Sequence, residues 1–472
     1  MKTILYISIC AAALLLGCAV GPDYKKPDVA DITPKEWHWK IAEPKDEMPK
    51  GEWWKLFGDP VLDGLESSAA ANNQDLRAAV ARVDEARAAA GLSRSRFFPE
   101  VSLAPSFTRE RTSANEPTPI PIRIPSTQLN VFSVPFDLNY EVDLWGRVRR
   151  SFEAVQAQAR ASAADYRNVL LTLTSDVAVN YFLLRSLDSE IEVLQRTVEL
   201  RGESVRILEE RFRAGAIPEL DAARAKTELS DAKAELADVK LRRADTLHAL
   251  ALLCGRPAGS FVIAERRITA SPPVVPAGLP SSLLERRPDI ARAERTLAAM
   301  NARIGVAVAG YFPLLRLTGQ AGYLSKRAET LFSADSRVWA LGPGVSLPLF
   351  NAGRTTAEVR QAEAVYREAL AGYRQTVLAA FKEVEDSLAQ MVLRDEQARA
   401  QDEAYAAARR AAELVKARYE AGAVSYFEVV DAERNVLREE RLRAQLAGLR
   451  FAAGMHLIKA LGGGWSGMAA EE

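Results

Sequence analysis

Few side chains in this sequence are arranged for chemistry, and Cys18 is the clearest of them. It ends a short apolar run that follows Lys2, and Gly17 stands directly before it. A basic start followed by an apolar run of this length is typical of a secretory signal peptide, because the run is too short to span a membrane permanently. Small Gly17 suits a signal peptidase, and the Cys18 thiol offers the nucleophile that forms a thioether with lipid. Residues 15–18 therefore resemble a bacterial lipobox.

Cleavage before Cys18 would remove residues 1–17 and leave a lipidated, palmitate-bearing N-terminus. Ala19 follows Cys18, whereas an aspartate there often marks retention at the inner membrane, so we expect sorting to the outer membrane. The alternative is an ordinary signal peptide with an incidental cysteine. The mature chain has one other cysteine, Cys254, whose apolar neighbourhood predicts a buried thiol. Without a disulfide framework, stability must come from packing or assembly.

Catalytic and metal-binding patterns are missing from the sequence. His38, His248 and His456 are too few and too scattered for a recognisable zinc motif. The sequence contains no GxSxG motif, no HExxH motif and no P-loop. Lys plus Arg and Asp plus Glu both number 62, which removes the broad positive field of most nucleic-acid-binding proteins. We expect no enzyme, no catalytic residue, no metal, no cofactor other than the lipid on Cys18, and no nucleic-acid partner.

A pair of carboxylates stands in the last quarter of the chain. Glu428 and Asp431 are three residues apart, so they share one face of a helix, and Phe427 precedes them. A solvated helix surface is the plain explanation of such a pair. Any functional role depends on the elements that position it.

Those elements are organised as an internal repeat, which the sequence shows by matched landmarks. Two pairs recur 214 residues later: Asp75-Leu76 and Phe98-Pro99 return as Asp289-Ile290 and Phe312-Pro313. Two further landmarks recur 207 residues later: Gly146-Arg147 and the run 211–216 return as Gly353-Arg354 and 418–423. The difference places a seven-residue excess between Pro99 and Gly146, which fits one longer hairpin loop.

Each repeat predicts a helix, two strands, a very long helix, a break and a further helix. Residues from about 62 to 96 have a helical pattern, and the segment 147–211 has no proline and a single glycine. At about 1.5 Å per residue, that segment would extend on the order of 100 Å. The break falls at Gly215, and Gly422 occupies the same place in the second repeat. A coiled-coil seam with steps of four and three follows the first break, apolar apart from Arg243 and Thr246: Ala225, Leu229, Ala232, Leu236, Val239, Arg243, Thr246 and Leu250.

Four segments alternate apolar and polar residues in the manner of strands, at about 100–110, 128–144, 314–324 and 338–350. Such strands could be half-buried in a soluble sheet. Each is, however, at least as long as the roughly 9 to 11 residues that a tilted membrane strand needs. Lipid cannot satisfy open sheet edges, and four strands are too few to close a barrel, which takes about eight. Strands in lipid would therefore require oligomerisation, and three copies would supply twelve.

Several local motifs complete the pattern. They are Cys18-Ala19-Val20-Gly21-Pro22-Asp23-Tyr24 after the lipobox, Trp53-Trp54, Phe57-Gly58-Asp59-Pro60 with Leu62, Arg286-Arg287-Pro288-Asp289-Ile290 with Ala293-Glu294, and Phe312-Pro313. Together they resemble the outer-membrane efflux factors of the TolC and OprM type, in the lipoprotein branch associated with resistance-nodulation-division (RND) pumps. The resemblance covers essentially the whole mature chain.

The resemblance implies a mainly α-helical homotrimer with a β membrane portion. Four strands per chain would form a twelve-stranded β-barrel in the outer membrane of a Gram-negative bacterium, continuing into a long periplasmic α-helical barrel with a mixed equatorial domain. The function implied is a passive exit duct of a tripartite efflux system, fed by an inner-membrane RND-type transporter through a periplasmic adaptor (membrane fusion protein). The alternative is a periplasmic adaptor or scaffold lipoprotein with helical hairpins. The expected segments are a signal peptide 1–17, a lipidated segment with equatorial contacts 18–61, a first repeat 62–256, a Pro-rich equatorial linker 257–282, a second repeat 283–462 and a tail 463–472.

The resemblance also gives the carboxylate pair a role. Phe427, Glu428 and Asp431 match the aperture positions of the family, at the periplasmic end of the duct. A trimer would place six carboxylates around one axis, and such a field draws cations and repels anions.

A second set of positions matches an inter-helix lock of the family. Asp221 and Tyr419 match a pair that ties neighbouring helix pairs together. Val424 departs from the TolC pattern, which has an arginine there, so the inherited lock is incomplete. Arg224 lies one turn beyond Asp221 and could reach Asp431; an ordinary surface salt bridge is the alternative for it.

Overall fold

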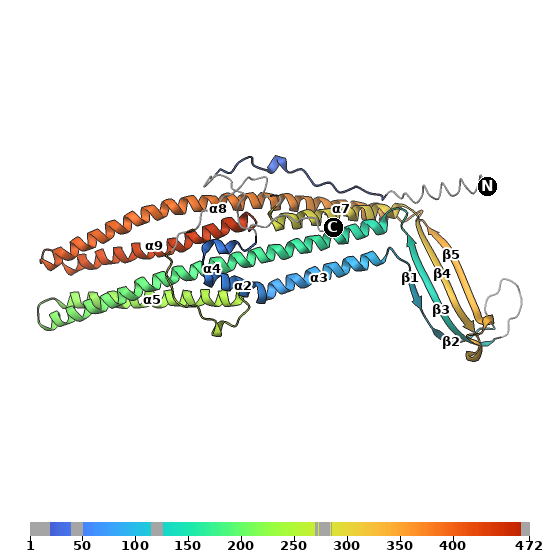
Figure 1. Ribbon diagram of the computed structural model, residues 1–472, viewed down its shortest axis with the longest axis horizontal. Helices are drawn as coiled ribbons and strands as arrows, with labels where there is room; N and C mark the ends of the chain where they lie inside the picture. The colour runs from blue at the N-terminus through green and yellow to red at the C-terminus, as the bar shows by residue number, and fades with distance from the viewer. Residues whose placement is uncertain are drawn as a thin grey trace. The chain divides into compact units, whose positions relative to one another are not determined.

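Long helices dominate the computed structural model, which describes residues 19–38, 51–114, 126–269 and 286–463 together with residues 272 and 284. A small antiparallel sheet accompanies the helices (Figure 1). The helices are α2 Pro60–Asn72, α3 Gln74–Ser95, α4 Arg147–Arg213, α5 Glu219–Leu253, α7 Pro288–Val308, α8 Arg354–Glu420 and α9 Tyr426–Ala460. The strands are β1 Glu100–Leu103, β2 Ser106–Arg111, β3 Gln128–Val142, β4 Leu314–Ser325 and β5 Arg337–Ser346. Short 3-10 turns lie at Ala30–Ile32, Trp53–Phe57, Ala258–Ser260, Ala309–Tyr311, Ala328–Thr330 and Ala334–Ser336.

The internal repeat is visible in the long helices. Helices α4 and α8 both have 67 residues, and α5 and α9 both have 35. Arg147 and Arg354, which begin α4 and α8, are 207 positions apart, as are Glu219 and Tyr426, which begin α5 and α9. Each repeat thus contains the same long hairpin, a 67-residue helix of about 100 Å followed by a return helix of half that length.

The first helical segment is two helices rather than the single helix expected from about 62 to 96. The chain breaks at Asn73, which has extended backbone angles (φ −60°, ψ 130°). Its side chain makes the break specific, because Oδ1 accepts a hydrogen bond from the N–H of Leu76 at 2.9 Å and Nδ2 donates to the carbonyl of Leu253 at 2.9 Å. Asparagine at such a position caps the following helix.

The sheet runs in the order β1-β3-β4-β5, and β2 also pairs with β3. All pairs are antiparallel; Leu103 lies opposite Phe136 in β1–β3, and Phe107 lies opposite Phe132 in β2–β3. Farther along the sheet Phe136 also lies opposite Ala321 in β3–β4. Strand β5 joins the sheet through β4 and forms its far edge.

Three of the expected strand boundaries are wrong, each for a local reason. The strand expected at 100–110 is divided into β1 and β2 at Ala104-Pro105, because proline has no N–H to donate to a neighbouring strand. The strand expected to reach residue 144 ends at Val142, since the carboxylate of Asp143 instead accepts hydrogen bonds from the N–H groups of Val148 and Arg149, both at 3.0 Å, and so caps α4. The last strand ends at Ser346, two residues before Pro348.

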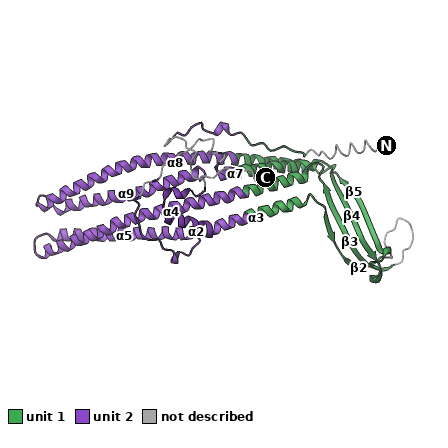
Figure 2. Ribbon diagram, in the orientation of Figure 1, with its two compact units in different colours: residues 1–27, 83–161, 293–372 green, residues 28–82, 162–292, 373–472 purple. Residues whose placement is uncertain are grey.

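The chain divides into two compact units, coloured in Figure 2. Unit 1 contains residues 1–27, 83–161 and 293–372, and unit 2 contains residues 28–82, 162–292 and 373–472. No helix in the described part of the chain is both long enough and apolar enough to cross a bilayer.

In unit 1 the segment that follows Cys18 is held in place by close contacts. The N–H of Val20 donates to the carbonyl of Trp145 at 3.0 Å, and the guanidinium of Arg150 binds Asp23 at 2.6 Å. Gly21 lies so close to Gly305 that a Cβ on Gly21 would be 2.4 Å from the Gly305 Cα. A side chain at Gly21 would therefore displace the segment.

The core of unit 2 lies where α4, α5 and α9 meet. Phe182 of α4 stacks on Phe451 of α9, with ring centroids 4.1 Å apart. Gly448 permits this approach, since a Cβ there would lie 2.6 Å from the Cβ of Ser186. The predicted seam of α5 faces this core: Ala225, Ala232, Val239, Thr246 and Leu250 are buried. Cys254 is also fully buried, as the sequence predicted.

Candidate functional site

The two long hairpins close with the same turn. At Gly215 and Gly422 the backbone has φ +73°, a left-handed conformation that favours glycine. In the first turn Ala216 N–H donates to Arg211 O at 2.9 Å, and in the second Ala423 N–H donates to Arg418 O at 2.8 Å. Both are the helix-ending pattern with glycine just past the last turn. The turns therefore present the starts of α5 and α9, and with them the predicted aperture and lock residues, at the same end of unit 2.

Phe427, Glu428 and Asp431 lie exposed on the first turns of α9. All three line a groove of about 640 Å³ between α9 and the alanine-rich face of α8. The guanidinium of Arg224, on α5, lies over the Phe427 ring at 5.1 Å from its centroid. Two carboxylates in the first turns of a helix are also favoured by the helix dipole, so their charge is stabilised where it stands. The predicted aperture residues thus form one accessible acidic face beside an aromatic ring.

The opposite face of the same turns is buried and connects all four long helices. Tyr426, Val429 and Val430 of α9 pack with Leu208 of α4 and Ala225 of α5, and Tyr419 of α8 packs against this cluster. The Tyr419 and Tyr426 rings lie 5.8 Å apart. Burial raises the pKa of the Tyr426 hydroxyl to about 12, so it stays protonated at neutral pH. The start of α9 is therefore fixed by an apolar contact while its acidic face stays in solvent.

An ion triad that the sequence analysis did not identify fixes α9 one turn farther along. Glu228 of α5, 5% exposed, is 3.1 Å from the guanidinium of Arg201 on α4 and also binds Arg434 of α9. Arg201 donates in addition to the Glu228 carbonyl at 2.8 Å. A second rung, Glu235 with Arg441, repeats the α5–α9 pairing seven residues later in both helices. This common spacing of seven is the signal by which the sequence could have predicted the contact.

The predicted lock is not assembled within one chain. Asp221 lies in the first turn of α5, and in the described part of the chain no hydrogen bond joins its side chain to Tyr419. Tyr419 packs against Tyr426 instead. Arg224 lies over Phe427, and no ion pair among the described residues connects it to Asp431. The lock between Asp221 and Tyr419, and the contact from Arg224 to Asp431, remain hypotheses.

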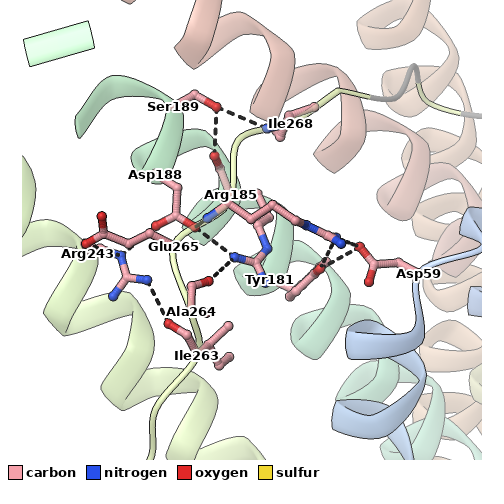
Figure 3. A network of polar contacts seen from close by, with 11 residues as sticks. Asp59, Tyr181, Arg185, Asp188, Ser189, Arg243, Ile263, Ala264, Glu265 and Ile268 are labelled. Atoms are coloured by element: carbon pink, nitrogen blue, oxygen red, sulfur yellow. Dashed lines mark hydrogen bonds and ion pairs between the residues drawn. The ribbon is translucent and has the colours of Figure 1, made fainter. Parts of the chain in front are cut away.

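A second polar site lies farther along the bundle, around Asp188 of α4 (Figure 3). Asp188 is 4% exposed and accepts hydrogen bonds from Arg185 at 2.9 Å, from Arg243 of α5 at 2.6 Å and from the backbone N–H of Arg266 at 3.0 Å. Arg243 is the polar residue that interrupted the predicted seam. Its place is explained by this buried carboxylate, which a periodic pattern alone cannot show.

The same site binds an irregular segment, residues 261–268, which we call the strap. Main-chain atoms make most of these contacts: Arg243 donates to the carbonyl of Ile263 at 2.9 Å, and Arg185 donates to the carbonyl of Ala264 at 2.6 Å. The N–H of Ile268 donates to the Ser189 hydroxyl at 3.2 Å (Figure 3). Buried backbone groups outside regular structure need such partners, so the strap is a fixed part of unit 2.

Asp59 connects the N-terminal part of unit 2 to the strap. Its carboxylate accepts from the Tyr181 hydroxyl at 2.6 Å and binds the guanidinium of Arg266. Burial raises the pKa of Asp59, but the hydrogen bonds from Tyr181 and the Val61 N–H, with the charge of Arg266, outweigh this and hold the pKa below its usual value. Asp59 is therefore a stable anion at neutral pH.

Other expectations from the sequence concern Cys18, the Pro-rich linker and metal binding. Cys18 lies outside the described residues, and so do residues 270, 271 and 273–282 of the expected linker 257–282. In the described part of the chain no group of three or more histidine, cysteine or acidic side chains is placed to hold a metal ion. The hairpin ends present two exposed carboxylates, Glu428 and Asp431, at an accessible groove.

Comparison with known proteins extends over both repeats. The family described as "Outer membrane efflux protein" matches residues 65–256 and 279–463. The chain is 33% identical over 466 residues to "Pyoverdine export outer membrane protein OpmQ" of Pseudomonas aeruginosa, a match that covers 97% of each chain. It is also 33% identical over 469 residues to "Solvent efflux pump outer membrane protein SrpC" of Pseudomonas putida, again covering 97% of each.

A solved structure shows the same fold. The one described as "Structural insights of the outer-membrane channel OprN" superposes with a TM-score of 0.88 at 30% identity, covering 95% of this chain and 100% of that chain. The resemblance of the motifs to the outer-membrane efflux family is confirmed.

Proposed function

This chain belongs to the outer membrane efflux protein family, and from that membership we propose that it forms the exit duct of a tripartite export system in a Gram-negative cell envelope. The observation that carries the proposal is the match of both repeats to efflux proteins over almost the full length of each chain. Substrates would be delivered by an inner-membrane RND-type transporter through a periplasmic adaptor. The alternative function, a periplasmic adaptor or scaffold lipoprotein, has no support, since these relatives matched over almost the full chain are outer-membrane efflux proteins.

The open sheet supports an assembly of three copies. In one chain β5 and the β1–β2 side are edges, and large apolar side chains such as Trp339 (80% exposed) and Leu341 (66% exposed) face outward. Lipid cannot satisfy the unpaired N–H and C=O groups of an edge strand, whereas neighbouring copies can. Because β1 and β2 pair with successive parts of β3, each sheet is four strands wide, and three sheets joined edge to edge would give a closed twelve-stranded barrel with an apolar outer surface.

The acidic face of α9 is the proposed periplasmic aperture. Glu428 and Asp431 from three copies would place six carboxylates around the axis, beside Phe427 as an apolar constriction. Their exposure in the single chain and their groove against α8 support this role. Such a ring would favour cations and restrict leakage through the duct.

The remaining segments follow the same proposal. Residues 1–17 would be removed as a signal peptide and Cys18 acylated, so that the anchor attaches directly before the segment held by Trp145 and Arg150. Residues 18–61 and 257–282 would form the equatorial belt around repeats 62–256 and 283–462, and residues 463–472 a tail. The duct would need no catalytic group and no cofactor beyond the lipid.

The comparisons do not identify which molecules the proposed duct would export. One relative is named for pyoverdine export and another for solvent efflux, although both match this chain equally well. A duct shared by such different molecules would leave selection to the transporter.

Planar-bilayer recording on the purified full chain tests the proposal. We expect discrete conductance steps and cation preference. Glu428→Gln combined with Asp431→Asn keeps side-chain size but removes charge, so we expect higher leak and weaker cation preference. Glu428→Asp combined with Asp431→Glu keeps the charge and is the matched control. A purified chain that never conducts, even after the charges are removed, would rule out the duct.

A further inference from the structure

The two faces of the sheet in unit 1 carry different charge. Side chains alternate along a strand, so the register of the strands assigns each residue to a face. One face, which we call the apolar face, consists of the odd-numbered residues of β1, β2, β4 and β5 and the even-numbered residues of β3. Its exposed apolar members include Phe136, Trp339 and Leu341. It is the face that lipid would cover in the proposed barrel.

Every charged residue that the described strands place on the apolar face is an arginine. There are three of them: Arg109, Arg111 and Arg337. The opposite face has the reverse balance, four carboxylates and one arginine: Glu100, Glu110, Asp137, Glu141 and Arg316. The charge on the apolar face is therefore entirely positive.

The three arginines lie at one end of the apolar face, which we call the outer end because it is away from the starts of α4 and α8. On β2 the aromatic Phe107 is followed on the same face by Arg109 and Arg111, which ends the strand. On β5 the first residue, Arg337, precedes the aromatic Trp339 on that face. The face thus changes from aromatic to cationic over one position on each of these strands.

The length of the apolar face places this change at the edge of a bilayer. Ten residue steps separate Phe132 from Val142, the two ends of its apolar run on β3. At about 3.3 Å per residue the run extends roughly 33 Å along the strand. A tilt of about 40° reduces this to roughly 25 Å, the height of the apolar band of a membrane barrel. Arg109 lies opposite Asn130, one position beyond Phe132, so its guanidinium would stand at the level of lipid headgroups.

These arginines are exposed, and none of the three forms an ion pair with a described residue. Arg109 donates to the side-chain oxygen of Gln128 at 3.2 Å, and Arg111 donates to the Ser126 hydroxyl at 2.9 Å. Both acceptors are neutral, so they leave the positive charge in place.

The inner end of the sheet differs in this respect. The two arginines that follow β3 each bind a carboxylate of the same segment: Arg147 binds Glu141, and Arg149 binds Asp143 at 3.2 Å. Positive charge is therefore neutralised within the chain at the inner end, and it is left for another partner at the outer end.

We propose that Arg109, Arg111 and Arg337 bind the phosphate groups of an anionic lipid in the outer leaflet of the membrane. The inference rests on the proposed barrel and adds the lipid chemistry that its outer end recognises. Guanidinium groups bind phosphate through two parallel N–H···O bonds, and their alkyl stems lie along apolar surface while the charge stays among headgroups. A headgroup with its own ammonium group would leave the arginine charge unbalanced, so the lipid must carry net negative charge.

Closure of the barrel would bring the three arginines together. Strand β5 and the β1–β2 side are the two edges of the sheet (Figure 1). If β5 of one copy joins the β1–β2 edge of the next, Arg337 of the first copy approaches Arg109 and Arg111 of the second. Like charges at such range repel, and a phosphate between them removes the repulsion. Each of the three junctions would then hold one lipid site.

Native mass spectrometry of the purified full chain, titrated with lipid A in detergent, tests the site. Lipid A is used as the probe because it joins phosphate groups to acyl chains. The wild-type trimer should bind it, and removal of the three charges should weaken the apparent affinity at least about tenfold, the loss that a single charge-assisted hydrogen bond would cause. The variant combines Arg109→Gln, Arg111→Gln and Arg337→Gln.

A matched control removes the same charge elsewhere. It replaces three exposed arginines on the opposite face of the sheet or on α8, and it should bind lipid A as tightly as the wild type: Arg316→Gln, Arg360→Gln and Arg367→Gln. Equal affinity of the variant and this control would overturn the site. If the triple variant does not assemble, Arg337→Gln is compared with Arg316→Gln, and equal binding there overturns the site as well.

Two further probes identify the source of the phosphate. Dephosphorylated lipid A keeps the acyl chains, and it should bind the wild type no more tightly than it binds the triple variant. Inorganic phosphate keeps the charge without the chains, and an excess of it should leave lipid A bound. Displacement of lipid A by inorganic phosphate would make this a site for a free anion and overturn the assignment to lipid.

Planar-bilayer recording separates this inference from the proposed duct. The triple variant should still conduct, because its substitutions face away from the lumen. A variant that conducts and binds lipid A as tightly as the wild type overturns the lipid site and leaves the duct intact. A wild-type chain that stays monomeric, never conducts and binds no lipid A overturns both.

Discussion

One ion pair occurs twice in this molecule, at positions related by the repeat, and its two surroundings differ. In the first hairpin Arg243 binds Asp188, whose side chain is 1% exposed and shared with Arg185 and the strap. In the second, 207 residues later, Arg450 binds Asp395, whose side chain is 46% exposed. The strap donates and accepts hydrogen bonds at the first pair, whereas at the second pair its last two residues, Arg267 and Ile268, only line a pocket that also contains Arg450. The comparison indicates that the first hairpin is held more tightly at this level, and that the second hairpin, which carries the proposed aperture residues, is less constrained.

The variant with the largest expected effect tests this comparison directly. Asp188→Ala should lower the free energy of unfolding by about 3–5 kcal/mol, because two arginines and a strap N–H lose a buried partner. Asp395→Ala, the repeat-matched control, should cost no more than about 1 kcal/mol, as for other exposed pairs. Chemical denaturation in detergent, followed by circular dichroism, measures both. Equal losses would contradict the assignment of one fixed and one less constrained hairpin.

The two ion pairs between α5 and α9, Glu228–Arg434 and Glu235–Arg441, give a finer test of how firmly α9 is held. Glu228→Gln should cost about 3 kcal/mol, since Arg201 and Arg434 then share a neutral partner in a buried place. Glu235→Gln, whose side chain is 45% exposed beside Arg441, should cost well under half as much. Unfolding midpoints give the difference. If both variants lose the same stability, the triad does not fasten α9.

A buried carboxyl in α2 gives the smallest effect and a pH dependence. Glu66 is 0% exposed, and neither of its carboxylate oxygens has a hydrogen-bond partner in the described structure. Burial, with the nearby charge of Asp63, raises its pKa to about 9. The folded state therefore holds a proton that the unfolded state, with a pKa of 4.5, releases. The group's contribution to stability is fully present below pH 4.5 and is lost as the pH rises toward 9.

Replacement of Glu66 should remove that dependence. Glu66→Leu should raise the free energy of unfolding at pH 8 by about 2 kcal/mol, because no unpaired polar group remains buried. It should also flatten the slope between pH 5 and pH 9. The groups facing Glu66 are Asp63 on its own helix and the Cys254 thiol at the end of α5. An unchanged slope would show that another group titrates.

Most of the architecture could be predicted from the sequence because it depends on spacing. The repeat offset of 207, the stop at Gly215 and Gly422 and the buried α5 seam all follow from periodic or glycine positions. The breaks at Asn73 and at Ala104-Pro105 were missed, since one asparagine or proline competes only weakly with a long surrounding pattern.

The candidate site was predicted less completely. Phe427, Glu428 and Asp431 lie together on an exposed face, as a helical spacing of three requires. The strap was not predictable, because its contacts use the carbonyls of Ile263 and Ala264, and a main-chain atom carries no sequence signal.

Because the strap is held through its main chain, its outward side chains are free for replacement. Val262 is 84% exposed at its start. A fluorophore or affinity tag attached through Val262→Cys would be held by the first hairpin, away from the groove between α8 and α9. A second label on α9 would then report any movement of that helix relative to the strap.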